Sequence, residues 1–162
     1  MTAALELSSN QVTHFYSEKK NTEEMIKLMD ILKIKYSHLD RIFLSWDAAS
    51  WHISKKLVEK IELENSKPVI SRGPIVERAP LPAGAQFLNV IEAVFSGMSR
   101  AIIHNSNYST KEQAMAAIDR YFLERNEYFQ KYPKRARNKI WGKEPSSVSF
   151  SESNNCKDPR YR

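Results

Sequence analysis

Segments typical of strands alternate along this chain with segments typical of helices, and this alternation places the chain in the α/β class. Residues 3–7 and 11–17 are rich in apolar, β-branched and aromatic side chains, and the polar turn between them predicts a β-hairpin. Short runs at 41–46 and 74–79 predict two further strands. The run at 41–46 is apolar and bounded by polar residues, so we expect it to be buried on both faces in a partly parallel sheet.

Four other segments have helical spacing of their apolar residues. The first helix is expected to begin at a capping box that starts with Asn21, and the second near Ser54. The third is expected from Leu88. A Ser-x-x-Glu capping box at Ser109 predicts the start of the fourth, which Pro133 must end.

Positive charge is concentrated in one short segment. The 162 residues include 25 Lys and Arg against 19 Asp and Glu, a net charge of +6. Residues 131–143 hold six bases and no acid beside several aromatic residues, a combination typical of nucleic-acid contact, although a solvated helix end and linker has the same composition. The bases that we expect to contact DNA are Lys131, Lys134, Arg135, Arg137, Lys139 and Lys143.

Several classes of protein do not fit the composition. The single Cys156 excludes a disulfide framework and a cysteine-based zinc site. No apolar run approaches the roughly 20 residues of a membrane span, and no export signal is visible. We therefore expect a protein of the cytoplasm without a membrane partner.

Two carboxylates occupy positions that suit a metal site. Asp47 follows the most apolar strand, where α/β folds place ligand groups, and Glu92 lies on the third predicted helix. Converging carboxylates bind hard divalent cations. The alternative is structural, because an Asp after a strand often caps a turn and an acid at a helix start favours the helix dipole.

The segments around these two acids resemble motifs of DDE transposases of the mariner-like and bacterial insertion-sequence group. In that family a hydrophobic strand ends in Asp-Asn-Ala-x-x-His, which Asp47, Ala49 and His52 match. A later Leu-Asn-Pro-Ile-Glu element opens a helix, and residues 88–92 read Leu-Asn-Val-Ile-Glu, which includes Asn89 and Glu92. The two motifs stand in the family's order, with 44 residues between the acids.

The resemblance implies a ribonuclease-H-like fold and DNA transposition by metal-dependent cleavage and strand transfer. It implies that Asp47 and Glu92 are catalytic ligands of Mg²⁺ or Mn²⁺, and that His52 and Asn89 support those ligands or contact DNA. The expected partner is the DNA of transposon ends, and the expected location is the nucleoid of a bacterial cell.

The chain also departs from the family. The strand with the family's first aspartate precedes the region matched by residues 3–17, so we expect an incomplete ribonuclease-H-like fold without its first strand and one of its three acids. Residues 1–143 are then part of the endonuclease domain, and 144–162 a disordered tail. A homodimer or a partner chain with the N-terminal part could complete it. The alternative is a non-catalytic, DNA-binding or self-associating transposase remnant.

Overall fold

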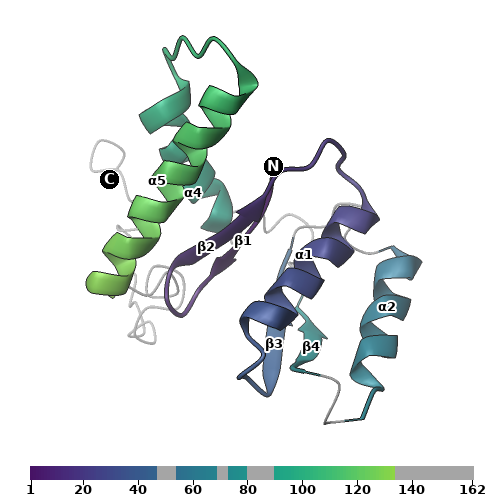
Figure 1. Ribbon diagram of the computed structural model, residues 1–162. Coiled ribbons are helices and arrows are strands. Elements are labelled where there is room, and N and C mark those ends of the chain that lie inside the picture. Colours follow the sequence, from purple (N-terminus) through teal and green to yellow (C-terminus); the bar gives the residue numbers. More distant parts are fainter. Residues whose placement is uncertain (47–53, 69–72, 80–89, 134–162) are drawn as a thin grey trace, which may run out of the picture.

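The computed structural model describes residues 1–46, 54–68, 73–79 and 90–133, which form helices and two small sheets (Figure 1). The mixed α/β class is confirmed. In chain order the elements are β1 (Thr2–Glu6), β2 (Gln11–Phe15), α1 (Thr22–Lys35), β3 (Arg41–Leu44), α2 (Lys55–Asn65), β4 (Ile75–Arg78), α4 (Val90–Met98), the π-helix η3 (Ser99–Ile103) and α5 (Lys111–Lys131).

Local capping determines where the first two helices begin, as the sequence predicts. Asn21 Oδ1 accepts the N–H of Glu24 at 3.2 Å, and Ser54 Oγ accepts the N–H of Leu57 at 3.3 Å. Each bond satisfies one of the backbone donors that a helix leaves unpaired at its start. The predicted starts at Asn21 and Ser54 are confirmed.

The start of α5 corrects the sequence prediction by one residue. Thr110, not Ser109, is the N-cap, and its Oγ1 accepts the N–H of Gln113 at 3.3 Å. Gln113 Oε1 in turn accepts the N–H of Ser109 at 2.9 Å. Two overlapping Ser/Thr-x-x-Glu/Gln patterns compete here, and the one that begins at Thr110 provides the cap, although the Gln113 side chain returns to the N–H of Ser109 and not to that of Thr110. The helix ends at Lys131, before Pro133, as expected.

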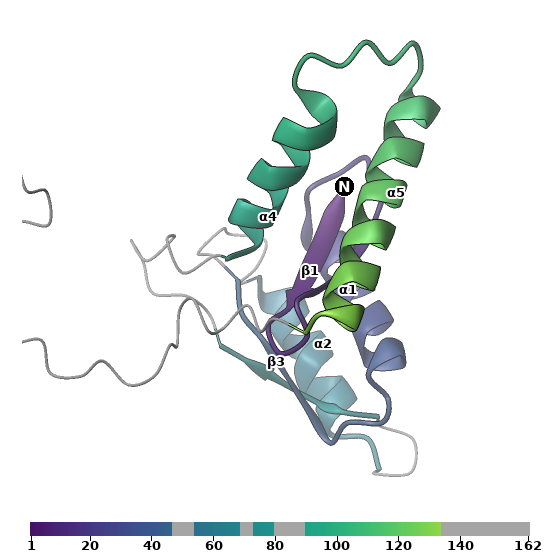
Figure 2. The same ribbon diagram turned by 90° about the vertical axis from the view of Figure 1, so that its left-hand side faces the viewer.

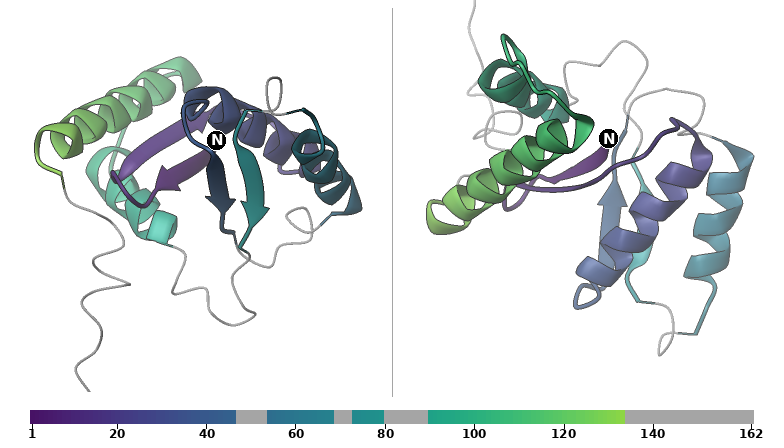
Figure 3. Two further views of the ribbon diagram at one scale, coloured as in Figure 1. Left: turned by 90° about the horizontal axis from the view of Figure 1, so that it is seen from below. Right: turned by 45° about the horizontal axis from the view of Figure 1, so that its top comes forward.

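The strands pair in two separate sheets within the described residues. β1 and β2 form the predicted antiparallel hairpin, in register from Thr2↔Phe15 to Glu6↔Gln11. β3 and β4 pair in parallel, from Arg41↔Ile75 to Leu44↔Arg78. Across the molecule the strands follow one another in the order β2, β1, β3, β4 (Figures 1 and 3).

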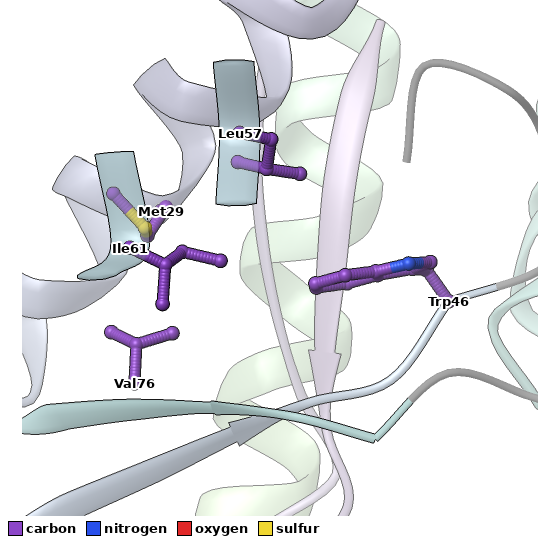
Figure 4. Packing of buried hydrophobic residues seen from close by; sticks show 5 residues of the cluster. All are labelled: Met29, Trp46, Leu57, Ile61 and Val76. Carbon is purple, nitrogen blue, oxygen red and sulfur yellow. The ribbon is translucent and has the colours of Figure 1, made fainter. Parts of the chain in front are cut away.

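Helices cover the two sheets from different sides. α1 and α2 pack on β3 and β4 around a core of Met29, Trp46, Leu57, Ile61 and Val76 (Figure 4). α4 and α5 lie alongside each other, joined at their far ends by the segment 99–110 (Figure 2), and cover the other face of the hairpin with a core of Val12, Met98 and Phe122. No helix in the described ranges is long and apolar enough to cross a bilayer.

Helix α1 joins the two halves. Its residues enter the core with α2, and its C-terminal end also contacts the hairpin. Tyr36, which caps α1, donates its hydroxyl to Glu6 at 2.8 Å, and Lys35 Nζ donates to Thr13 Oγ1 at 2.7 Å. The hairpin therefore has α1 on one face and α4 with α5 on the other.

The expectation that the strand at 41–46 is buried on both faces is wrong. Leu44 and Trp46 face the core with α1 and α2, but Phe43 points to the opposite face and is 65% exposed. The apolar run has the composition of an interior strand, yet β3 pairs with β4 alone among the described strands.

Candidate metal and nucleic-acid site

Glu92 lies in the first turn of α4 with its side chain exposed. Three residues of α4, Val94, Phe95 and Met98, pack in the core with the hairpin and α5, so that core holds the helix in place. A carboxylate in a first turn is favoured by the helix dipole whether or not it binds a cation. The position of Glu92 thus fits both readings of the sequence.

The strand that leads to Asp47 is anchored by Trp46. The Trp46 side chain is 7% exposed and lies at the edge of the first core, on the side away from Ile61 and Val76 (Figure 4). Trp46 is the last described residue of this segment, and Asp47 follows it in the sequence. Asp47, His52 and Asn89 themselves lie outside the described residues, as does the distance between the two predicted ligands.

No complete metal site occurs within residues 1–46, 54–68, 73–79 and 90–133. No three His, Cys, Asp or Glu side chains in these ranges come together in a way that could hold an ion. Of the two predicted ligands, Asp47 and Glu92, these ranges include Glu92 alone.

The C-terminal end of α5 carries exposed aromatic rings beside a lysine. Tyr128 and Tyr132 are 57% and 54% exposed, and their ring centroids lie 5.1 Å apart. The ammonium of Lys131 lies 5.5 Å from the centroid of Tyr132. In nucleic-acid-binding proteins, bases stack on exposed aromatic rings, and phosphates bind to nearby cationic side chains. We call Tyr128, Lys131 and Tyr132 the α5 tip.

Lys131 is the one base of the predicted DNA-binding run that the structure describes, and it is exposed on the last turn of α5. Lys134, Arg135, Arg137, Lys139 and Lys143 lie outside the described residues. The predicted tail at 144–162 also lies outside them.

Polar contacts that sequence reasoning missed fix α5 against the hairpin. The Arg125 guanidinium donates to the Asn10 carbonyl and to Asn10 Oδ1, both at 2.6 Å, and its burial lowers the pKa of Arg125. Asn10 has the left-handed φ of 60°, which Asn adopts more readily than most residues. These bonds hold the direction of α5, and therefore the position of the α5 tip, relative to the sheet.

An open hollow of about 660 Å³ lies between β2, α1 and α5. Among its lining residues, His14 Nε2 and Asp119 Oδ1 are 2.8 Å apart. The hydroxyl of Tyr16, which does not line the hollow, donates to the same Asp119 oxygen at 2.8 Å. The bond with His14 lowers the pKa of Asp119 below its ordinary value, despite some burial. The Tyr16 hydroxyl also donates to the Met115 carbonyl at 2.8 Å. Because these bonds join β2 to α5, we interpret the cluster as a structural joint.

The comparisons with known proteins give no neighbour. No family model matches the chain, and neither a curated protein nor a solved structure matches it.

Proposed function

We propose that the chain is the C-terminal part of the catalytic domain of a DDE transposase, with a ribonuclease-H-like fold and metal-dependent DNA cleavage and strand transfer as its ancestral chemistry. The observation that supports this best is the position of Glu92, exposed on the first turn of a helix that the core with the hairpin holds in place. Trp46 likewise anchors the chain directly before Asp47.

In this proposal Asp47 and Glu92 hold Mg²⁺ or Mn²⁺. Their oxygen donors are of the kind that hard cations prefer, and His52 and Asn89 orient them or contact DNA. When bound, the ions would polarise the phosphate of the DNA and activate a water or a 3′-hydroxyl for in-line displacement. Two carboxylates leave such a site short of negative charge, so a third acid comes from another polypeptide segment, on a partner chain or in a homodimer.

The α5 tip and the basic residues that follow it have the second role. Lys131 and the bases at 134–143 neutralise backbone phosphates, and Tyr128 and Tyr132 offer surfaces on which bases or sugars stack. The bonds from Arg125 to Asn10 attach α5 to the hairpin, and α4 packs in the same core as α5 and the hairpin. The proposed substrate is transposon-end DNA in a bacterial cytoplasm.

The experiment is nicking of supercoiled plasmid by the purified chain at millimolar Mn²⁺. We expect nicking that needs the metal and falls at least about tenfold in Glu92→Gln and in Asp47→Asn, because each change removes an ionised ligand. The matched control is Glu112→Gln, since Glu112 is also an exposed acid in a first helical turn. It should leave nicking unchanged. Nicking that survives both ligand substitutions would overturn the catalytic proposal. An inactive wild-type chain would overturn the form of the proposal in which a homodimer completes the site.

A non-catalytic DNA-binding remnant is the second candidate, and the exposed rings of the α5 tip favour it. This function needs no metal. It would be supported by DNA affinity that is the same in EDTA and in Mn²⁺, together with absent nicking.

A further inference from the structure

An asparagine side chain clamps one residue on the outer edge of each sheet. On β2, the Val12 N–H donates to Asn126 Oδ1 and Asn126 Nδ2 donates to the Val12 carbonyl, each at 2.8 Å. On β4, Asn65 makes the same two bonds to Val76, each at 2.9 Å. Each clamp takes the place of a neighbouring strand at that residue, and so protects an edge that could otherwise recruit one.

The hairpin register shows that the clamp covers only part of the outer edge of β2. In an antiparallel pair, a residue directs both of its backbone groups either toward the partner strand or away from it, and the two cases alternate along the strand. Val12 directs both groups outward to Asn126, so His14, two residues further, directs its own outward as well. Within the described residues no group binds the His14 N–H or carbonyl. The edge is therefore closed at Val12 and open at His14.

The open part of this edge borders the hollow of about 660 Å³. Residues of β2, α1 and α5 line the hollow, and none of the described residues of β1 does, so it lies beside the outer edge of the hairpin. α5 runs along this edge in the direction opposite to β2, because Asn126 contacts Val12 and Asp119 contacts His14 (Figures 1 and 3). We call this hollow, which has a strand edge beside a helix, the β2–α5 groove.

The two sides of the β2–α5 groove differ in polarity. On the α5 side, Leu123 is 59% exposed beside the fully buried Phe122. Arg120, also on this side, is exposed and has no ion pair within the described residues. On the α1 side, Lys35 Nζ donates to Thr13 Oγ1 at 2.7 Å. The groove thus suits an extended segment with one apolar face toward α5 and one polar face toward α1.

The chain itself contains such a segment after α5. Residues 147–151 read Ser-Val-Ser-Phe-Ser, the alternation of a strand with one apolar face. Val148 and Phe150 share the apolar face, and Glu152 follows on the same face. These residues lie outside the described part of the chain.

The link between α5 and this segment is long enough to reach the groove. α5 ends at Lys131, and Leu123 lies eight residues earlier, about 12 Å back along the helix. The fifteen residues 132–146 connect Lys131 to the segment, and fully extended they would span about 50 Å. The excess length costs little, because the entropy of closing a loop rises slowly with its length.

We propose that residues 147–152 pair with the outer edge of β2 and fill the β2–α5 groove of their own chain. The backbone of the segment bonds to the outward N–H and carbonyl of His14, and the side chains of Val148 and Phe150 pack on Leu123. The segment covers the part of the edge that the asparagine clamp leaves open. The inference rests on this edge and on the sequence after α5, and is independent of Asp47 and Glu92.

Charge determines the direction of the segment. If it runs parallel to β2 with Phe150 beside Leu123, Glu152 lies about 6.6 Å further along the strand. Arg120 lies about 4.5 Å from Leu123 along α5 in the same direction, so the two opposite charges meet. Asp119, the acid next to Arg120, is occupied by the bonds of the structural joint.

The test measures amide hydrogen exchange in the full-length chain. The apolar-face variant is Val148→Asp/Phe150→Asp, which places two charges on the face that packs on α5. The matched control, the serine-face variant, is Ser149→Asp/Ser151→Asp, which adds the same two charges to the opposite face. The clamped amide of Val12 is the reference that reports an intact hairpin in every variant.

We expect the His14 amide to exchange slowly in the wild type and in the serine-face variant, and at least about tenfold faster in the apolar-face variant, with the Val12 reference unchanged. Leu123→Asp should accelerate His14 to the same extent, because it removes the apolar contact from the other side. Leu63→Asp, at a similarly exposed position on α2, should leave His14 protected.

Fast exchange of His14 in the wild type would overturn the inference, as would equal rates in the wild type and the apolar-face variant. Protection that rises with protein concentration would show that a second copy covers the edge, and would also overturn it. A charge reversal tests the direction: Arg120→Glu should weaken the protection, and Glu152→Arg in the same chain should restore it. A double variant that is no better protected than Arg120→Glu alone would contradict the parallel direction.

Discussion

The side-chain amide of Asn126 binds both backbone groups of Val12, accepting its N–H and donating to its carbonyl at 2.8 Å each. One side chain on α5 thus both attaches the helix to the hairpin and completes the hydrogen bonding of an edge strand. Val12 itself is 3% exposed, so no solvent could replace these bonds without local opening.

Replacing Asn126 should therefore destabilise the fold. In Asn126→Leu the Val12 N–H and carbonyl lose their partners in a buried place, which costs about 1–3 kcal/mol of unfolding free energy. Urea denaturation followed by circular dichroism measures it. Asn107→Leu, at an exposed position, is the control and should change stability by less than about 0.5 kcal/mol. Equal stability of the two variants would contradict the role of the clamp.

Glu64 predicts a pH dependence of stability. Its carboxylate accepts hydrogen bonds from Lys33 at 2.8 Å, Lys60 at 2.9 Å and Lys67 at 2.7 Å, and these bonds, that of Lys33 first, hold its pKa well below the ordinary 4.5. A lowered pKa in the folded state stabilises the protein at pH values above about 4.5, and the stabilisation is lost as the pH falls below that value.

Glu64→Gln should consequently be less stable than the wild type by about 2–4 kcal/mol at pH 7, because it leaves the buried ammonium of Lys33 without its counter-charge. The difference should shrink as the pH falls below about 4.5. Denaturant midpoints at pH 7, 5 and 3 measure this. The control is Glu59→Gln, whose exposed pair with Lys55 should matter little at any pH. A difference that is independent of pH would contradict the assignment.

Much of the fold can be predicted from the sequence where local chemistry decides it. The helix starts at Asn21 and Ser54 depend on side chains within three residues of the cap, and the hairpin depends on a short turn. The predicted start of α5 was wrong by one residue, because Ser109 and Thr110 are each followed three residues later by Glu or Gln and both therefore match the capping-box pattern.

Features that depend on distant parts of the chain could not be predicted. The exposure of Phe43 follows from which strands pair with β3, which its apolar neighbours do not reveal. Asn65 and Asn126 look like solvent-facing helix residues, and their place on a strand edge depends on segments 11 and 114 residues away. For the candidate site, the sequence predicts Glu92 at a helix start, but its separation from Asp47 depends on the packing of α4 against the sheet.

The rings of the α5 tip should contribute to nucleic-acid binding. We expect Tyr128→Ala and Tyr132→Ala each to weaken the binding of a single-stranded oligonucleotide by about 1–3 kcal/mol, the usual value of one base stacked on a ring. Fluorescence anisotropy at fixed salt measures the affinity. Tyr108→Ala, which removes a partly exposed ring just before the start of α5, at the opposite end of that helix from the α5 tip, is the control. If all three variants have the same affinity, bases do not stack on the rings of the α5 tip.

The basic segment should determine the salt dependence of DNA binding. Neutralising Lys134, Arg135 and Arg137 together should weaken affinity and flatten the slope of log affinity against log salt by up to ~0.9 for each lost phosphate contact. Titrations between low and moderate salt measure this slope. Lys111→Gln, at the opposite end of α5, should leave it unchanged. If the triple variant keeps the wild-type slope, these residues do not contact phosphates.

The central claim is that Asp47 and Glu92 share a divalent cation, and paramagnetic broadening by Mn²⁺ tests it most directly. The amide NMR signals of Trp46 and of Glu92 belong to segments far apart in the sequence, and one shared ion should broaden both at the same substoichiometric concentration. Both effects should disappear together in Asp47→Asn and in Glu92→Gln, and should persist in Glu112→Gln. Broadening at one of these amides without the other, or at neither, would contradict the claim.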